Sequence, residues 1–152
     1  MWLARRRPPM LNAVDPRADI SMLRCLTDGE ASFIRAVADK LNSAQRVQLL
    51  SDLTLARAEE ILNDASLIRF HLAGYERGDD HGQHTYPIEG QLNDSDGTPV
   101  HVLLFADLAD KLYELEFLRW GDGPLQAPDW ASLKLIEGPR HEGQGDIARS
   151  RD

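Results

Sequence analysis

The chain has 152 residues, of which 42% are hydrophobic, and it carries a formal net charge of −8. A chain of this length typically buries roughly 70% of its unfolded surface, which predicts one globular domain with a self-supporting core. The single cysteine, Cys25, excludes an internal disulfide framework and a zinc site with several thiolates, and it favours a reducing compartment. No run approaches the roughly 18 apolar residues of a membrane-spanning helix. We therefore expect a cytoplasmic protein with no membrane partner.

The charge is unevenly distributed along the chain. Residues 18–137 hold 21 acidic and 10 basic side chains, a balance of −11, whereas the two ends taken together are net basic. An acidic body argues against a nucleic-acid partner, because phosphate contacts need clustered lysines and arginines. It fits a protein that attracts a basic partner, and it fits equally a charge that only keeps the protein in solution.

The composition also divides the chain into three parts. We expect residues 1–17 to form a flexible arm, residues 18–137 a single α+β domain, and residues 138–152 a disordered tail. Met10 follows an arginine- and proline-rich run, so the sequence leaves open whether Met1 or Met10 is the start.

Residues 26–41, LTDGEASFIRAVADKL, predict an amphipathic helix. Thr27 and Glu30 have the spacing of a capping box, in which each side chain accepts a hydrogen bond from the other residue's backbone N–H. Apolar residues then recur at helical spacing and give one buried stripe. They are Phe33, Ile34, Val37 and Leu41.

A second helix is predicted to begin at Ser43, whose hydroxyl can cap it. Its expected apolar face is made of Val47, Leu50 and Leu53. Where this helix ends is left open. Helix propensity would extend it to Leu62, whereas the turn signal NDAS at residues 63–66 would make residues 55–62 a strand.

The rest of the chain has the alternation of β-strands. In the first strand Ile68, Phe70 and Leu72 share a face, and the glycine-rich residues 74–84 that follow predict an exposed loop. In the next strand Gly90 suggests a bulge or a close approach. The DSDG turn joins two further strands into a hairpin, and the apolar residues 130–136 are expected to pack back on the body. The predicted strands are residues 66–73, 85–93, 98–107 and 111–120.

Helices followed by antiparallel strands are typical of an α+β fold. We expect two N-terminal helices packed on one face of a curved antiparallel sheet of about five strands, connected as a meander.

The strand KLYELEFLRW, residues 111–120, supplies the first candidate site. Glu114 and Glu116 are two residues apart, so their carboxylates share one face of the strand. They fit an acid–base pair, a surface that meets a partner or ligand, or only the solvated side of a sheet. The apolar row of Tyr113, Leu115 and Phe117 is expected to face the core, which leaves the two glutamates on the opposite, partly exposed face.

The histidines supply the second candidate site. His71 and His101 are predicted on neighbouring strands, on the same face as Glu114 and Glu116, and the four would form a polar cluster. His81 and His84, near Asp79 and Asp80, match no metal-site template, so a solvated loop is expected and no metal or cofactor is predicted. The sequence contains no glycine-rich phosphate loop, His-Glu-x-x-His or Gly-x-Ser-x-Gly motif, which argues against nucleotide-dependent and standard hydrolase chemistry.

Four motifs together resemble a small bacterial domain family of unknown function. They are LTDGE, SLIRF, DSDG and LYELEFLRWGDGPLQ. Family members carry a run close to Phe-Glu-Leu-Asp-x-Trp-Lys, followed by Ser-Pro-Leu, and the resemblance spans residues 24–128. The chain departs from the pattern at NDAS, which replaces a glycine-rich turn, and at Leu118, where tryptophan is usual. The resemblance implies a strand at residues 55–62, polar signature positions at Glu114, Glu116 and Arg119, and a likeness to immunity proteins.

The expected function is non-enzymatic binding of a protein partner, in particular neutralisation of a basic toxin such as a nuclease through the acidic surface. The binding residues proposed from the sequence are Glu114, Glu116, Arg119, His71 and His101. A second hypothesis is a small-ligand binder or enzyme that uses the histidine and glutamate cluster, and a third is a regulatory domain with no small-molecule site. Partner identity and oligomeric state do not follow from the sequence.

Overall fold

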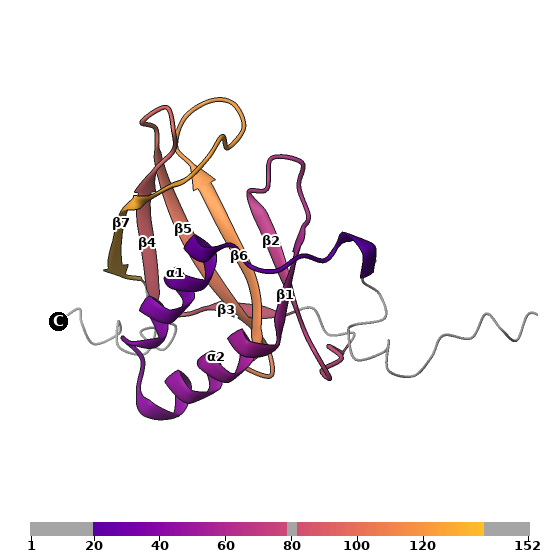
Figure 1. Ribbon diagram of the computed structural model, residues 1–152. Coiled ribbons are helices and arrows are strands. Elements are labelled where there is room, and N and C mark those ends of the chain that lie inside the picture. Colours follow the sequence, from indigo (N-terminus) through magenta and orange to yellow (C-terminus); the bar gives the residue numbers. More distant parts are fainter. Residues whose placement is uncertain (1–19, 79–81, 139–152) are drawn as a thin grey trace, which may run out of the picture.

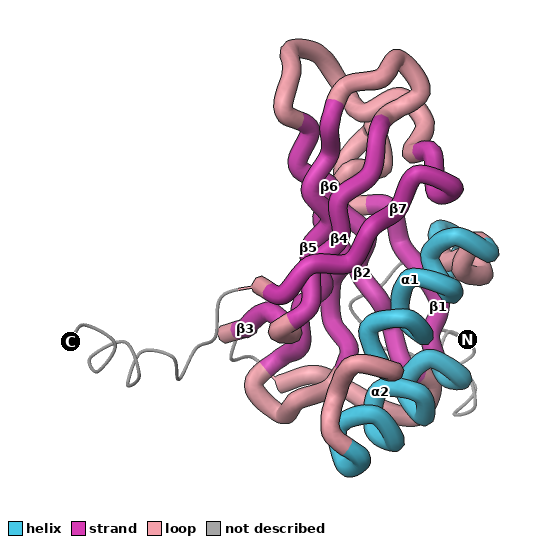
Figure 2. The backbone as a smooth tube through the Cα atoms, turned by 90° about the vertical axis from the view of Figure 1, so that its left-hand side faces the viewer, coloured by secondary structure: helices cyan, strands magenta, loops and turns pink. Residues whose placement is uncertain are grey.

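The structure, a computed structural model, describes residues 20–78 and 82–138. A 3-10 helix at Ile20–Met22 precedes two α-helices and seven strands, and both α-helices lie against one face of the sheet (Figure 1 and Figure 2). This confirms the α+β class and the two helices on one face. The elements are α1 (Asp28–Ala38), α2 (Ser43–Leu55), β1 (Ala56–Glu60), β2 (Leu67–Leu72), β3 (Gln83–Thr85), β4 (Ile88–Asn93), β5 (Pro99–Asp107), β6 (Leu112–Arg119) and β7 (Asp129–Glu137).

The sheet is antiparallel in the order β1-β2-β6-β5-β4-β7. The short strand β3 pairs with the last residues of β5, on the same edge of β5 that β4 occupies further back along that strand. The prediction of about five strands was therefore too low, because β3 and β7 also pair. The plain meander was also wrong, since β2 lies beside β6 and β7 returns to β4. β7 was predicted only as an apolar patch because Leu133, Leu135 and Ile136 do not alternate strictly, and all three are half-buried.

The first helix forms as its sequence predicts. Glu30 N donates to Thr27 Oγ1 (3.1 Å) and Thr27 N donates to Glu30 Oε1 (2.9 Å), which completes the capping box. The predicted stripe residues Phe33, Ile34 and Val37 are fully buried in the core.

The second helix begins as expected but buries a different face. Asn42 caps it instead of Ser43, since Asn42 Oδ1 accepts from Gln45 N at 2.9 Å. Its buried residues are Leu49 and Asp52, whereas Val47 is 68% exposed, so placing Val47 in the core was wrong. Val47 precedes Leu49 by two residues, which turns it roughly 200° around the helix from the buried face.

The open question after α2 is resolved as a strand. The helix ends at Leu55, and β1 begins at once because Ala56 is extended, with φ −84° and ψ 138°. The NDAS turn then returns the chain into β2, with Ala65 in the left-handed region at φ 61°. On the outer edge of β1, Arg24 and Ala58 form an isolated antiparallel β-bridge with two backbone hydrogen bonds.

A β-bulge changes the predicted core row of β6. Phe105 faces Glu114 and Ala106 faces Leu112, so Tyr113 is an extra residue in the strand. As a result Leu112 joins Leu115 and Phe117 in the core, and Tyr113 leaves it to pack against Arg69 on the other face. The prediction that Tyr113 faces the core was therefore wrong, because the alternation on which it rested is interrupted.

Two local predictions in the remaining strands have different outcomes. Gly90 is a site of close approach: a Cβ there would lie 2.9 Å from both Phe33 Cε1 and Leu133 Cδ1. The segment 74–84 is not only an exposed loop, since it contains Arg77, which is 8% exposed, and the start of β3. Gly138 is described and donates to the Pro87 carbonyl at 2.7 Å, whereas the predicted arm at 1–17 and the rest of the predicted tail lie outside the described residues.

Candidate functional site

Four of the five predicted binding residues lie on the sheet face that the helices leave open, but they do not converge. Glu114 and Glu116 alternate with core residues of β6, and His71 lies on β2 and His101 on β5, on opposite sides of that strand. Arg69 faces Glu114 whereas His101 faces Leu118, so the two histidines lie toward opposite ends of the sheet.

Each of the four also has its own surroundings. Arg69 donates to Glu114 Oε2 at 2.8 and 2.6 Å, and His71 Nε2 lies 2.8 Å from Glu59. His101 Nε2 lies 2.6 Å from Glu89 Oε1 but without hydrogen-bond geometry.

The two glutamates differ in exposure. Glu114 is buried, which corrects its predicted partial exposure, because its carboxylate is drawn into the ion pair with Arg69. Glu116 is half-buried, and burial together with the charge of Glu114 raises the pKa of Glu116. A single catalytic centre would need these groups to face one another, and the described geometry does not bring them together.

The fifth predicted residue, Arg119, joins two loops. Its guanidinium donates to Asp94 Oδ2 (2.8 Å) and to both carboxylate oxygens of Asp96 (3.0 and 2.9 Å). It also donates to the Asp122 carbonyl at 3.1 Å. Arg119 therefore holds the DSDG turn against the loop that follows β6, and the turn and the LRWGDG run act as one structural unit.

Asp94 is the centre of this unit. Its carboxylate is fully buried and also accepts the backbone N–H groups of Ser95 (2.9 Å), Gln126 (2.9 Å) and Ala127 (2.7 Å). Burial acts to raise its pKa, but the three N–H donors and Arg119 outweigh burial, and the pKa of Asp94 lies below its ordinary value.

The β1–β2 turn is attached to the same loop. Asp64 accepts from Leu125 N at 3.0 Å and from Ser66 N at 3.1 Å, and the Leu125 N–H lowers the pKa of Asp64. Three connections thus meet at one end of the sheet, which we call the loop end. They are residues 61–66, 94–98 and 120–128.

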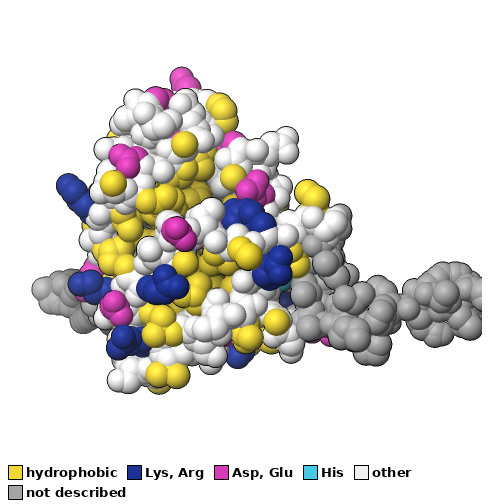
Figure 3. All heavy atoms as spheres, viewed as in Figure 1, with side chains coloured by type: hydrophobic (Ala, Val, Ile, Leu, Met, Phe, Trp, Pro, Cys, Tyr) yellow, Lys and Arg dark blue, Asp and Glu magenta, His cyan; other side chains and the backbone are white. Residues whose placement is uncertain are grey.

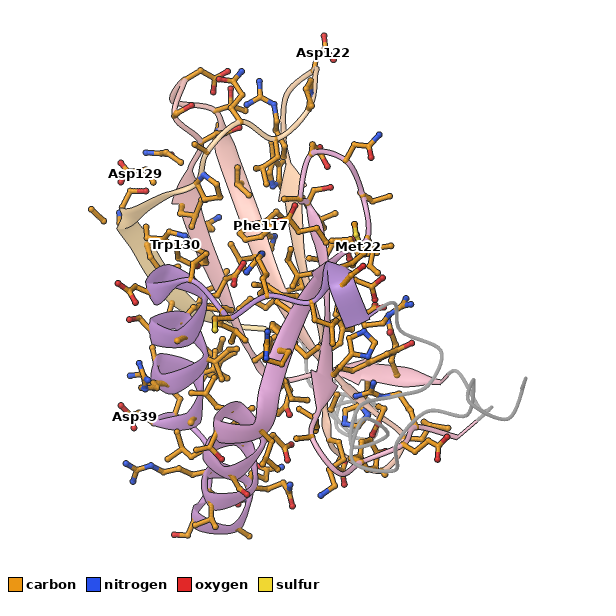
Figure 4. The ribbon with its side chains drawn as sticks, turned by 45° about the vertical axis from the view of Figure 1, so that its right-hand side comes forward. Met22, Asp39, Phe117, Asp122, Asp129 and Trp130 are labelled. Carbon is orange, nitrogen blue, oxygen red and sulfur yellow. The ribbon has the colours of Figure 1, made fainter. Side chains whose placement is uncertain are left out.

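A hollow with apolar walls and a polar rim lies on the helix side of the sheet, between residues 61–66, residues 120–128 and the start of α1. Phe117 and Leu125, each 6% exposed, and the half-buried Trp130 form its apolar walls, and its volume is about 180 Å³. Hydrophobic side chains gather in the upper half of Figure 3, and Figure 4 shows Phe117 between Trp130 and Met22. The other lining residues are Arg24, Thr27, Glu30, Glu60, Asp64, Ala65, Gln126 and Pro128.

Trp130 owes its place to a glycine in the first turn of α1. A Cβ at Gly29 would overlap the Trp130 ring, so only glycine lets the indole lie against the helix. The ring also meets Phe117 edge-on, with centroids 5.8 Å apart, and is tilted against Phe33 at 6.1 Å.

Negative charge gathers around this hollow. Eight carboxylates lie in the three loops and the adjoining chain, against two arginines that are already paired with four of them. By contrast, exposed basic side chains lie on the two helices and the turn between them, namely Arg35, Lys40 and Arg46. Figure 3 shows several Lys and Arg side chains on this face. The loop-end carboxylates are Asp28, Glu30, Glu60, Asp64, Asp94, Asp96, Asp122 and Asp129, and the arginines are Arg24 and Arg119.

The opposite end of the sheet, next to α2, has a buried network of its own, and we call it the helix end. Asp107 accepts from Arg77 Nε (2.8 Å) and the Tyr75 hydroxyl (2.7 Å). Arg77 lies over the Tyr113 ring, 4.3 Å from its centroid, and donates to the Leu112 carbonyl at 2.8 Å. Burial and the bond to Asp107 raise the pKa of Tyr75 to about 12.

A second hollow of about 310 Å³ lies at this end, lined in part by Gln48, His84, Tyr86 and Asp110. Among the residues that the structure describes, none is a hydrogen-bond partner of the buried Tyr86 hydroxyl, and burial raises the pKa of Tyr86. His84 Nε2 lies 3.2 Å from Asp110. His81 lies outside the described residues, and within 20–78 and 82–138 no three His, Cys, Asp or Glu side chains are grouped to hold a metal.

The family model described as Domain of unknown function (DUF6984) matches residues 23–128. The chain belongs to this family. The matched span agrees closely with the resemblance noted from the motifs, and it contains all three loop-end connections. No curated protein and no solved structure matches the chain. Within the described part, no helix has the length and apolarity needed to cross a membrane.

Several residues of the loop end were not predicted from the sequence. Trp130 lies in a segment predicted only to pack back on the body, and Asp64 and Asp94 were interpreted as turn formers. The available signal was local: an aspartate at the first position of a turn often accepts backbone N–H groups. Nothing in the sequence indicated that Asp64 and Asp94 also accept hydrogen bonds from the 120–128 loop, which lies 61 residues from Asp64 and 32 from Asp94 along the chain.

Proposed function

We propose that this DUF6984 domain is a non-enzymatic binding protein of the cytoplasm that captures a basic protein partner through its acidic loop end. In its sharper form the proposal is an immunity protein that neutralises a basic toxin, such as a nuclease. The observation that carries it is the concentration of carboxylates around an apolar hollow at one end of the sheet.

Electrostatics supports a basic partner. A surface of one sign attracts a partner of the opposite sign over roughly a Debye length and speeds its capture. Asp122 and Asp129 are exposed at the loop end. The two arginines there, Arg24 and Arg119, offset only two of the eight carboxylate charges, so the loop end keeps a surplus of negative charge.

The architecture supports binding over catalysis. Both predicted histidines and Glu114 are held in separate pairs on the open face, and Arg119 is engaged in holding loops together. The loop end, in contrast, combines apolar area with a polar rim, as interfaces do.

The test compares two doubly charge-reversed variants of the full chain. Glu60→Lys with Asp122→Lys changes the loop end, whereas Asp39→Lys with Glu76→Lys makes the same change in net charge at exposed positions elsewhere. Proteins captured from the native host are identified by mass spectrometry. We expect a basic partner whose binding falls at least about 10-fold in the loop-end variant and is retained in the control.

The immunity form has its own test. The protein is co-expressed with the product of the neighbouring gene, and cell survival is measured. Rescue by the wild type and not by the loop-end variant is expected. Capture of no basic protein, together with no rescue, would overturn the proposal.

A further inference from the structure

Resting on the proposed function and deepening it, we infer that the apolar hollow is the anchor site for a short basic segment of the partner. One bulky aliphatic or aromatic side chain of that segment enters between Phe117, Leu125 and Trp130. Flanking lysines or arginines of the same segment meet the carboxylates of the rim.

The size of the hollow fits one side chain. Its volume is about 180 Å³, and an apolar cavity of about 150 Å³ is large enough to hold benzene. The wall residues Phe117 and Leu125 are packed into the core, and the backbone N–H of Leu125 donates to Asp64. A preformed pocket of this kind suits the anchor residue of an interface, because little ordering is needed when it is filled.

The charge around the hollow selects the flanking residues. Glu60 and Asp64 line it directly, and Asp129 is adjacent to Trp130 (Figure 4). Arg24 is the lining cation, and its guanidinium already binds Glu30 at 2.9 and 3.0 Å and Glu60 at 3.0 Å. The rim therefore has a surplus of carboxylate, which disfavours an acidic segment and favours a basic one.

The nearest comparable surface lacks this combination. Trp120, 69% exposed, stacks on His101 at 6.4 Å at the same end of the sheet, outside the hollow. It offers an aromatic ring without an enclosing pocket, which makes it a matched control for Trp130.

The experiment uses three fluorescein-labelled peptides of seven residues and the full chain. The first has a central leucine flanked on each side by glycine and two lysines. The second replaces that leucine with serine, and the third replaces the lysines with glutamates. Binding is measured by fluorescence anisotropy at low salt. The leucine peptide is expected to bind about 10- to 100-fold more tightly than the serine peptide, as burial of one large aliphatic side chain predicts.

Three substitutions locate the site and test its rim. Trp130→Ala should remove most of the advantage of leucine over serine, whereas Trp120→Ala should leave it within about two-fold. Glu60→Lys, at a side chain that is 48% exposed, should weaken both lysine peptides and not the preference for leucine. Circular dichroism checks that each variant is folded. If Trp130→Ala does not fold, Glu60→Lys still tests the charged rim.

The inference is overturned if the leucine and serine peptides bind equally, or if Trp120→Ala matters as much as Trp130→Ala. Failure of the peptide test with continued, loop-end-dependent capture of a basic protein would remove the anchor site and leave the proposed function standing. A preference for the leucine peptide, with no basic partner captured from the host, would support the anchor site and remove the proposed function.

Discussion

Each end of the sheet is organised around a buried aspartate that is paired with an arginine, but the two ends differ in what surrounds that arginine. At the helix end Asp107 accepts four hydrogen bonds, from Tyr75, Arg77 and the backbone N–H groups of Ala109 and Lys111. Arg77 is buried, and aromatic rings flank it. The side chains around Asp107 thus satisfy one another and form a packed network, and the hollow at this end lies beside that network.

At the loop end Asp94 also accepts four hydrogen bonds, from Arg119 and three backbone N–H groups. Here the arginine shares its remaining donors with the exposed Asp96, and the loops enclose a hollow instead of a packed network. A buried carboxylate can thus serve either to complete a core or to hold loops around an open surface. The difference lies in what covers the arginine.

The largest effect is expected at the helix end. Arg77→Met leaves Asp107 buried without its cation, which typically costs about 3–5 kcal/mol of unfolding free energy. Urea denaturation at pH 7 measures it, with Arg57→Met at an exposed position as control. Equal midpoints for the two variants would show that the helix end does not depend on this pair.

A smaller and more local effect is expected from Arg119→Met. Asp94 keeps its three backbone donors, so the loops should loosen without global unfolding. Hydrogen exchange should become faster in residues 94–98 and 120–128 and stay unchanged in residues 107–112. Uniformly faster exchange throughout the domain would contradict a local role.

Acid should weaken both ends, because the pKa values of Asp94 and Asp107 lie below their ordinary range. Their contribution to stability is complete above the unfolded pKa near 4 and is lost as the pH falls through the lower folded values. The urea concentration at the unfolding midpoint should therefore decrease when the pH is lowered below about 4. Asp94→Asn should show a shallower drop, and an identical pH profile would contradict the assignment.

The smallest effect concerns the open face between the two ends. Burial and Glu114 raise the pKa of Glu116, so its charged form is disfavoured in the folded state. Glu116→Gln should slightly raise the urea midpoint at pH 7, and the gain should vanish below about pH 4, where the unfolded carboxyl is also protonated. Glu76→Gln at an exposed position is the control, and a lower midpoint for Glu116→Gln would indicate an unrecognised bond.

The sequence by itself determined the features that depend on neighbours in the chain. The capping box of Thr27 and Glu30, the buried stripe of α1 and the DSDG hairpin follow from local spacing. Membership of the family was also predicted from linear motifs, and the family model that matches residues 23–128 confirms it. These features are decided within a few residues, where periodicity and turn chemistry act.

Only the tertiary structure decided the site. The bulge at Tyr113 depends on the register of β5, and the edge strand β7 depends on β4 being available for pairing. Arg119 was identified as a signature position, but its partners lie in another turn. The hollow lies between the 61–66 turn, the 120–128 loop and the start of α1, and Asp64 joins the first two by its bond to Leu125. No local pattern records such a long-range hydrogen bond.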